Sequence, residues 1–273
     1  MGYELENKII DALAGVPLDY NEQIAFIREE KKKKVKWEKA GVLVLLGKDQ
    51  NQSSLLDNYF FILNKRSDKV RQPGDLCFPG GHPNHWIDYI SSRFIVPYIL
   101  PLRRGPGFKM NKRIKRESFR VIMYFLSNVL RESFEEMRLN PFKVDFLGAL
   151  GCYRLEEFHR LIFPIVGIMK RETKLKQNWE VEKVLRIAIT SLFNHDKYAK
   201  YRLRVRGKFK QIFGGDWIDR NCFIHSEEGQ QDEILWGATY EITMSFLKIA
   251  FSFSPPHNKT SPVIQGELYP TIS

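Results

Sequence analysis

The spacing of apolar and polar positions changes several times along the chain. Residues 3–14 place apolar side chains at helical spacing, which predicts a short amphipathic helix, and residues 22–39 predict a second, highly charged helix. The apolar run "GVLVLLG" at 41–47 is bounded by glycines and predicts a buried strand. Another strand is predicted at 58–65. The chain therefore begins with two helices and continues into a sheet.

The remaining pattern combines further strands with one long central helix. That helix is predicted from about residue 117 to residue 137, whereas residues 82–115 show no sustained period. Irregular alternation of this kind favours a mixed-sheet α/β or α+β domain over a helical bundle. The further strands expected are 144–150, 160–169, 201–206 and 221–225, and a closing helix is expected at about 233–250.

Chain length and composition set the domain organisation. The 273 residues suffice for one domain with a substantial core, and a hydrophobic content of 43% argues against wholesale disorder. The predicted organisation is an N-terminal helical extension at 1–39, one domain at 40–253 with an insertion at about 84–116, and a disordered tail at 254–273.

Cysteine usage and hydropathy bear on the compartment. Cys77, Cys152 and Cys222 are few and widely spaced, which favours reduced thiols over a disulfide framework or a zinc site. The start "MGYELENKII" lacks the basic and apolar regions of a signal peptide. The apolar stretch 94–102 is too short to span a bilayer and contains two prolines. A cytoplasmic protein with no membrane partner is expected.

Basic residues gather in three runs, and the formal net charge is +11. A single run of this kind is typical of a solvated surface. Three together, at 31–39, 103–120 and 197–210, favour a phosphate-bearing ligand or nucleic acid without choosing between them.

Three carboxylates share one face of the long central helix. At 100° per residue, Glu132, Glu135 and Glu136 in "RESFEEMRL" fall within one sector. Such carboxylates repel one another, so the face is either a solvated acidic surface or a site for a divalent cation. Mg²⁺ and Mn²⁺ prefer oxygen ligands, and Arg131 is placed to hold one carboxylate. The opposite face carries Leu126, Leu130, Phe134 and Met137 and is expected to pack on the core.

The same stretch resembles the second half of the Nudix box, R-E-U-x-E-E-x-G-U, with Arg138 at the usual glycine position. The segment "FPGG" at 78–81 resembles the start of that box, but it lies 50 residues before Arg131 when counted from Gly81, far more than the family's spacing. Where the family has an acid six positions after the glycine, this chain has Ile87, and Asp88 or Glu117 are the candidate substitutes. The sequence therefore resembles a Nudix box split by an insertion.

The residues before the glycines resemble one branch of that family, the coenzyme A diphosphatases. The resemblance extends over about 40–250 and implies a Nudix-type mixed sheet between helices. It also implies cleavage of coenzyme A or acyl-coenzyme A to 3′,5′-ADP and a 4′-phosphopantetheine product. The matching residues in "ILNKRSDKVRQPGDLCFPGG" are Leu63, Arg66, Ser67, Gly74, Phe78, Pro79, Gly80 and Gly81, and Arg71 lies one residue nearer Gly74 than in the branch motif.

The resemblance implies roles for individual residues. Glu132, Glu135 and Glu136 would hold Mg²⁺ or Mn²⁺. Arg131 and Glu132 would act in catalysis, and the general base would be Glu132 or an acid of the later "NWEVE" loop, Glu180 or Glu182. The expected substrate-binding residues are Arg66, Ser67, Arg71, Gly80 and Gly81, with Lys65 and Lys69 adding positive charge near the diphosphate.

Two alternatives stay open at this stage. The first keeps the reaction and changes the substrate to ADP-ribose, a dinucleoside polyphosphate or a nucleoside triphosphate. The second is a non-catalytic Nudix scaffold that binds a nucleotide or RNA through its basic insertion, which the missing acid at Ile87 favours. A small nucleotide is the expected partner, nucleic acid is the less favoured one, and a homodimer is compatible with the sequence.

Overall fold

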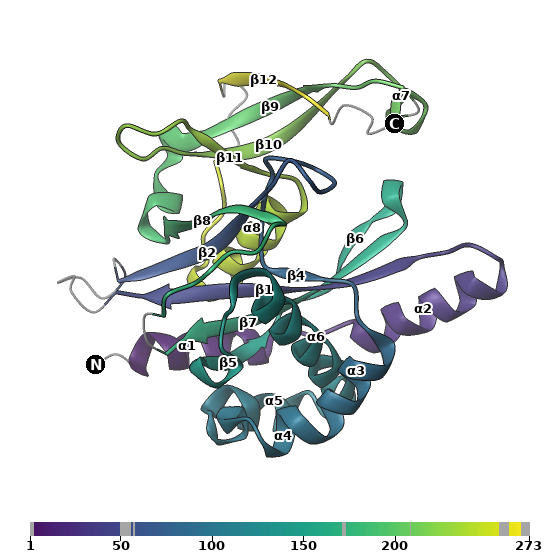
Figure 1. The fold of residues 1–273 in the computed structure, drawn as a ribbon, viewed down its shortest axis with the longest axis vertical. Coiled ribbons are helices and arrows are strands. Elements are labelled where there is room, and N and C mark those ends of the chain that lie inside the picture. The colour runs from purple at the N-terminus through teal and green to yellow at the C-terminus, as the bar shows by residue number, and fades with distance from the viewer. Residues whose placement is uncertain are drawn as a thin grey trace.

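A mixed eight-stranded sheet occupies the centre of the molecule, and a four-stranded sheet lies at one end (Figure 1). The computed structural model describes residues 3–49, 56, 58–170, 173–207, 209–256 and 262–268. The predicted fold class, a mixed sheet between helices, is confirmed. The strands of the large sheet are β1 (Glu38–Lys48), β2 (Tyr59–Arg66), β3 (Leu76–Cys77), β4 (Gly80–Gly81), β5 (Val144–Ala149), β6 (Tyr153–Leu155), β7 (Arg160–Met169) and β8 (Val181–Ala188).

The large sheet runs in the order β3-β2-β1-β7-β5, with β4 beside β1, β6 beside β7 and β8 beside β2. Only the β1–β7 pair is parallel, and it joins residues from Glu38↔Arg160 to Leu46↔Ile168. Because side chains alternate along a strand, β1 sends Leu43 and Leu45 to one face and Val44 and Leu46 to the other. The sheet therefore has a separate hydrophobic core on each face.

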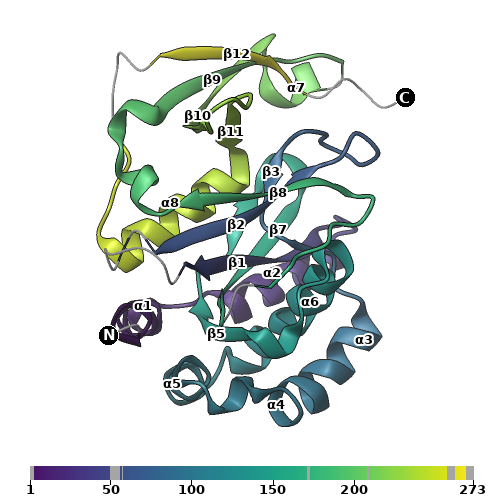
Figure 2. The same ribbon diagram turned by 60° about the vertical axis from the view of Figure 1, so that its left-hand side comes forward.

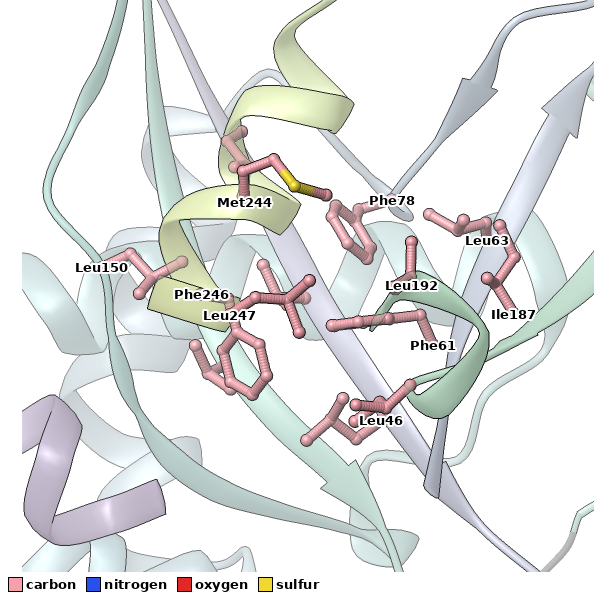
Figure 3. Packing of buried hydrophobic residues seen from close by; sticks show 14 of the residues in the cluster. Leu46, Phe61, Leu63, Phe78, Leu150, Ile187, Leu192, Met244, Phe246 and Leu247 are labelled. Carbon is pink, nitrogen blue, oxygen red and sulfur yellow. The ribbon is translucent and has the colours of Figure 1, made fainter. Parts of the chain in front are cut away.

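Helices cover both of these faces (Figure 2). On one side α1 (Tyr3–Gly15) and α8 (Gly237–Phe251) pack on the core that includes Leu46, Phe61 and Phe246 (Figure 3). On the other side lie α2 (Tyr20–Lys32) and α6 (Phe119–Met137). The predicted helix at 3–14 and the long central helix are confirmed, whereas the second helix ends at Lys32 and β1 begins at Glu38, before the predicted boundary at residue 40.

The insertion is helical, although its sequence shows no sustained period. Its buried side chains, among them Val96, Leu100 and Phe108, join the core on the α6 side of the sheet. The absence of a regular period reflects short helices of different kinds joined end to end. They are α3 (His85–Ile90), the π-helix η1 (Ser91–Ile95), α4 (Val96–Tyr98), the 3₁₀-helix η2 (Pro101–Arg104) and α5 (Pro106–Ile114).

The smaller sheet contains part of the expected disordered tail. Its order is β11-β10-β9-β12, and β12 (Val263–Glu267) pairs in parallel with β9 (Tyr198–Arg204). The prediction of disorder is therefore wrong for residues 263–267, while 257–261 and 269–273 lie outside the described residues. The remaining elements are β10 (Trp217–His225), β11 (Glu233–Trp236), α7 (Phe209–Phe213), η3 (Pro141–Lys143), η4 (Glu156–Phe158), η5 (Thr190–Phe193) and η6 (His195–Lys197).

Helix α6 ends without the glycine that such an exit usually uses. Arg138 adopts the left-handed conformation, with φ 57° and ψ 30°, and its N–H donates to the carbonyl of Phe134. The Arg138 guanidinium lies over the Phe134 ring, 5.3 Å from its centroid. Phe134 is 44% exposed, so its predicted place in the core is wrong, whereas Leu126, Leu130 and Met137 are buried as predicted.

Within the part of the chain that the structure describes, no helix has the length and apolar character needed to cross a bilayer. Cys77, Cys152 and Cys222 are free, and Cys222 is buried.

Candidate functional site

The two halves of the split motif meet where β4 packs against α6. The N–H of Gly80 donates to Glu136 Oε2 at 3.4 Å, although 56 residues separate the two in sequence. A Cβ on Gly81 would lie 2.8 Å from the Glu132 carboxylate, and a Cβ on Gly80 would lie 2.2 Å from the Gly41 carbonyl oxygen of β1. Gly80 also has a φ of 154°. Glycine is therefore needed at position 80, where β4 approaches the backbone of β1, whereas a side chain at position 81 would displace the Glu132 carboxylate.

A buried ion pair connects the insertion to α6. Arg131 Nε donates to Asp88 Oδ1 at 3.0 Å and Arg131 Nη2 donates to Asp88 Oδ2 at 3.1 Å. Asp88 belongs to α3 and is 0% exposed, and the N–H of Asn84 also donates to it at 2.7 Å. The other candidate substitute, Glu117, is exposed before the first turn of α6, about 20 Å along the helix axis from Glu132. Of the two acids, only Asp88 reaches the cluster.

Arg131 is the centre of the acidic cluster. Besides Asp88, it donates to Glu132 Oε1 at 2.8 Å and to Glu135 at 3.1 Å. Burial alone would disfavour its charged form, but the hydrogen bond to Asp88 and the neighbouring charge of Glu132 outweigh that effect and raise the pKa of Arg131. The guanidinium is thus firmly cationic and fixes the orientation of the carboxylates around it.

Glu136 is the carboxylate of the cluster whose negative charge is least balanced by positive groups. It accepts hydrogen bonds from Asn64 Nδ2 at 2.9 Å and from the Gly80 N–H, and among the described residues it has no ion-pair partner. Burial, followed by the charge of Glu132, raises the pKa of Glu136 to about 8 despite the Gly80 bond, and Glu180 adds to the rise. Burial likewise raises the pKa of Glu132. The site therefore has more negative charge than its arginines neutralise.

The loop that carries Glu180 is tied to the same site. The Ser67 N–H donates to the Glu180 carbonyl at 2.9 Å, and the Asn178 N–H donates to the Glu136 carbonyl at 2.8 Å. The Ser67 hydroxyl donates to the Trp179 carbonyl at 2.8 Å and accepts from the Lys69 N–H at 3.3 Å. Ser67 is accordingly engaged in fixing this loop, which brings Glu180 beside Glu136.

Glu182 and Lys65, which the sequence also suggested for the site, lie away from the α6 carboxylates. Glu182 pairs with Lys65 at 3.2 Å, and Lys65 also pairs with Glu233 of β11 at 3.2 Å. Strand alternation explains this, because Lys65 points to the opposite face of β2 from Asn64. Neither Lys65 nor Glu182 therefore belongs to the group of residues at α6 that the sequence suggested.

Arg66 is on the α6 side of β2, and Arg71 is in the loop that follows this strand. Arg66 Nε donates to the Arg71 carbonyl at 2.7 Å, and the positive charge of Arg66 acts to lower the pKa of Glu136. The Arg71 side chain is exposed. Arg66 thus acts on the acidic cluster through its charge, whereas Arg71 is connected to Arg66 through its backbone carbonyl.

The carboxylates provide the oxygen ligands that a divalent cation prefers, but in this structure they do not converge on one point. Glu132, Glu135 and Glu136 supply hard oxygen donors on one helix face, and the uncompensated charge at Glu136 suits a cation such as Mg²⁺ or Mn²⁺. Within the described residues, no three acidic, histidine or cysteine side chains already converge as a metal site. The reason is visible in the contacts, because Arg131 holds Glu132 and Glu135 while Asn64 holds Glu136.

Two asparagines of the site were missed from the sequence. Asn64, buried in β2, contacts Glu136, and Asn128 of α6 donates to Asp88 Oδ2 at 3.4 Å. Asn64 could have been found from strand alternation, because it lies two residues before Arg66 and therefore on the same face of β2. The signal for Asn128 was its helical spacing, three residues before Arg131.

A surface hollow lies far from this cluster, on the smaller sheet. It is lined by Arg202, Trp217, Asp219 and Gln265 and has a volume of about 510 Å³. Arg202 and Asp219 make two hydrogen bonds to each other, at 2.8 and 2.9 Å, so their charges are mutually neutralised. The hollow offers none of the carboxylate chemistry found at α6.

Comparisons with known proteins give remote likenesses only. No family model matches the chain, and no curated protein matches it. Among solved structures, a MutT/nudix family protein from Enterococcus faecalis is 13% identical with a TM-score of 0.40, covering 84% of this chain and 71% of that chain. A Nudix hydrolase from Alicyclobacillus acidocaldarius is 14% identical with a TM-score of 0.39, covering 56% and 80%.

An Ap4A hydrolase from C. elegans is 13% identical with a TM-score of 0.33, covering 56% of this chain and 81% of that chain. At these identities and scores, the likeness supplies no argument for an activity or a substrate, and the function has to be argued from the residues of the site.

Proposed function

We propose that the protein is a metal-dependent Nudix hydrolase that cleaves the diphosphate of coenzyme A or acyl-coenzyme A to 3′,5′-ADP and a 4′-phosphopantetheine product. The observation that carries the proposal is the contact between the two halves of the split motif. Gly80 and Gly81 touch Glu136 and Glu132, although 50 residues separate Gly81 from Arg131. A chance resemblance in two distant segments would not require them to meet.

The buried acid from the insertion supports a catalytic scaffold over a purely binding one. The missing acid at Ile87 was the main argument for a non-catalytic protein. Asp88, one residue later, provides a buried carboxylate bonded to Arg131 at 3.0 and 3.1 Å. The insertion therefore preserves an acid–arginine contact beside the glutamates, and the pattern is not one of erosion.

We assign separate roles in metal binding, substrate binding and positioning to the residues of the site. Glu132, Glu135 and Glu136 would hold Mg²⁺ or Mn²⁺, which when bound supplies Lewis-acid stabilisation of the diphosphate and acidifies water. Arg66 and Arg71 would bind and orient the diphosphate, and the Gly80–Gly81 backbone would allow its close approach. Arg131 positions Glu132 and Glu135 through its hydrogen bonds.

Glu180 is our candidate for the general base. Its loop is fixed by Ser67 and Asn178, and its charge acts on Glu136. Glu182 is a poorer candidate, because Lys65 holds its carboxylate on the other side of β2. In this scheme Glu180 takes the proton from the water that attacks phosphorus.

A substrate panel tests the proposal. Purified protein is incubated with Mg²⁺ or Mn²⁺ and coenzyme A, acetyl-coenzyme A, ADP-ribose, a dinucleoside polyphosphate or a nucleoside triphosphate, and the products are identified by mass spectrometry. Formation of 3′,5′-ADP that stops on chelation supports it. Preference for another diphosphate would keep the reaction and change the substrate. No turnover on any member of the panel would leave only a binding protein.

A further inference from the structure

The outer helical segment, residues 85–99 of α3, η1 and α4, exposes its large apolar side chains. Trp86 is 75% exposed, Tyr98 68% and Phe94 63%. A contiguous apolar surface of this kind is rare on a protein with no partner for it. The other exposed members of the patch are Ile87, Tyr89, Ile90, Ile95 and Ile99.

The buried side of the same segment is a narrow stripe with a spacing of four residues. Within the segment it consists of Asp88, Ser92 and Val96, and Leu100 directly after the segment continues the stripe. Two of these four are polar, and Asp88 is buried because Arg131 pairs with it. The segment is thus inverted relative to an ordinary surface helix, since most of its apolar area faces outward. That outward area does not serve the core of the protein.

The insertion that carries this apolar surface is also strongly basic. Residues 84–116 contain eight Lys and Arg and one acid, Asp88, whose charge is already paired with Arg131. Arg93 lies within the outer helical segment, and Arg103 and Arg104 follow it in η2. The exposed basic residues of the insertion are Arg93, Arg103, Arg104, Lys109, Lys112, Arg113 and Arg116. A partner for this surface therefore has to be both apolar and anionic.

We propose that the outer helical segment docks on an anionic lipid surface. Trp and Tyr prefer the boundary between headgroups and acyl chains, isoleucine and phenylalanine enter the apolar side, and Lys and Arg are attracted by anionic headgroups. The patch combines all three groups in one insertion. The earlier expectation of no membrane partner rested on the lack of a spanning segment, and docking on a surface needs none.

The position of the segment in the fold fits such docking. The outer helical segment lies at the end of the molecule opposite the smaller sheet (Figures 1 and 2). Nothing in the described part of the chain covers its outward side, as the exposure of Trp86 and Phe94 shows. The segment is anchored from behind by Asp88 and Val96, so it can bear a contact without unfolding.

Co-sedimentation with vesicles tests this inference on the full chain. The wild-type protein should bind vesicles of phosphatidylcholine and phosphatidylserine, bind pure phosphatidylcholine vesicles far less, and be released by salt. The triple variant Trp86→Ser, Phe94→Ser, Ile99→Ser should bind the anionic vesicles at least about tenfold more weakly. These three side chains are exposed, so thermal melting should match that of wild type.

A matched control removes as many exposed apolar side chains from the other end of the molecule. The triple variant Ile212→Ser, Trp217→Ser, Val263→Ser alters α7, β10 and β12 and should bind like wild type. Failure of wild type to bind either vesicle, or equal binding by the first triple variant, would overturn the proposal. So would light scattering that shows a wild-type dimer dissociated by that variant, because the surface would then join two copies of the chain.

Discussion

Helix α6 and the outer helical segment lie side by side but bury opposite kinds of side chain. Helix α6 buries Leu126, Leu130 and Met137 and turns its carboxylates outward, as its sequence period predicts. The outer helical segment buries Asp88 and Ser92 and turns Trp86 and its apolar neighbours outward. The ion pair between Asp88 and Arg131, with the Asn128–Asp88 hydrogen bond beside it, connects the two arrangements. In α6, packing on the core determines which side chains are buried. In the outer helical segment, the ion pair and the outward surface determine it.

Removal of the connecting carboxylate should have the largest effect on stability. Asp88→Asn leaves Arg131 without its buried anionic partner, which typically costs about 3 kcal/mol or more. Glu135→Gln removes an exposed partner of the same arginine and should cost less than about 1 kcal/mol. Urea unfolding of both variants measures the difference. Equal losses would mean that the contact does not join the insertion to α6.

The uncompensated charge at Glu136 should appear as a pH dependence of the metal-free protein. A carboxyl pKa raised to about 8 means that the folded state binds its proton more tightly than the unfolded state. Stability therefore falls as pH rises from the ordinary carboxyl value through about 8. Glu136→Gln removes this part of the slope, so it should gain on the order of 2 kcal/mol over wild type above that pH.

The measurement is unfolding in the presence of chelator at a series of pH values. Wild type and Glu136→Gln should have similar stability near the acidic end and diverge as pH rises. Glu228→Gln, which changes an exposed acid in the turn before β11, should run parallel to wild type. Parallel curves for Glu136→Gln as well would contradict the assigned environment of Glu136.

The smallest effect is expected at the end of α6. Arg138→Gly relieves a left-handed conformation that costs a non-glycine residue about 1 kcal/mol, but it loses a cation–π contact with Phe134 worth about 0.5 kcal/mol. A net gain of about 0.5 kcal/mol should appear in chemical unfolding. Arg138→Ala keeps the strain and loses the contact, so it should be less stable than wild type.

The sequence predicted the strands β1, β2, β5 and β7 and the carboxylate face of α6, because those depend on local periodicity. It did not predict the helical insertion, whose short α, π and 3₁₀ pieces each last too few residues to show a period. Strand β12 was missed because its edge pairing with β9 is set by a long-range contact. Phe134 was misplaced because it lies at the edge of the apolar face of α6, where it is 44% exposed.

In the candidate site, too, local sequence patterns identified some residues, and long-range contacts decided the others. The sequence pointed to Arg131, the glutamates and the glycines, and it considered Asp88 and Glu117 equally as the missing acid. Only the structure separates those two, because the path of the insertion brings Asp88 back to α6. It likewise separates Glu180 from Glu182 by the faces of β2 and β8.

The central claim is that the α6 carboxylates hold a cation that drives diphosphate hydrolysis. Its most direct test is turnover of coenzyme A with Mn²⁺ by wild type, Glu136→Gln and the matched control Glu228→Gln, with folding checked by circular dichroism. We predict 3′,5′-ADP formation by wild type and by Glu228→Gln, and none by a folded Glu136→Gln. Full activity of Glu136→Gln would contradict the account and leave α6 with a solvated acidic face.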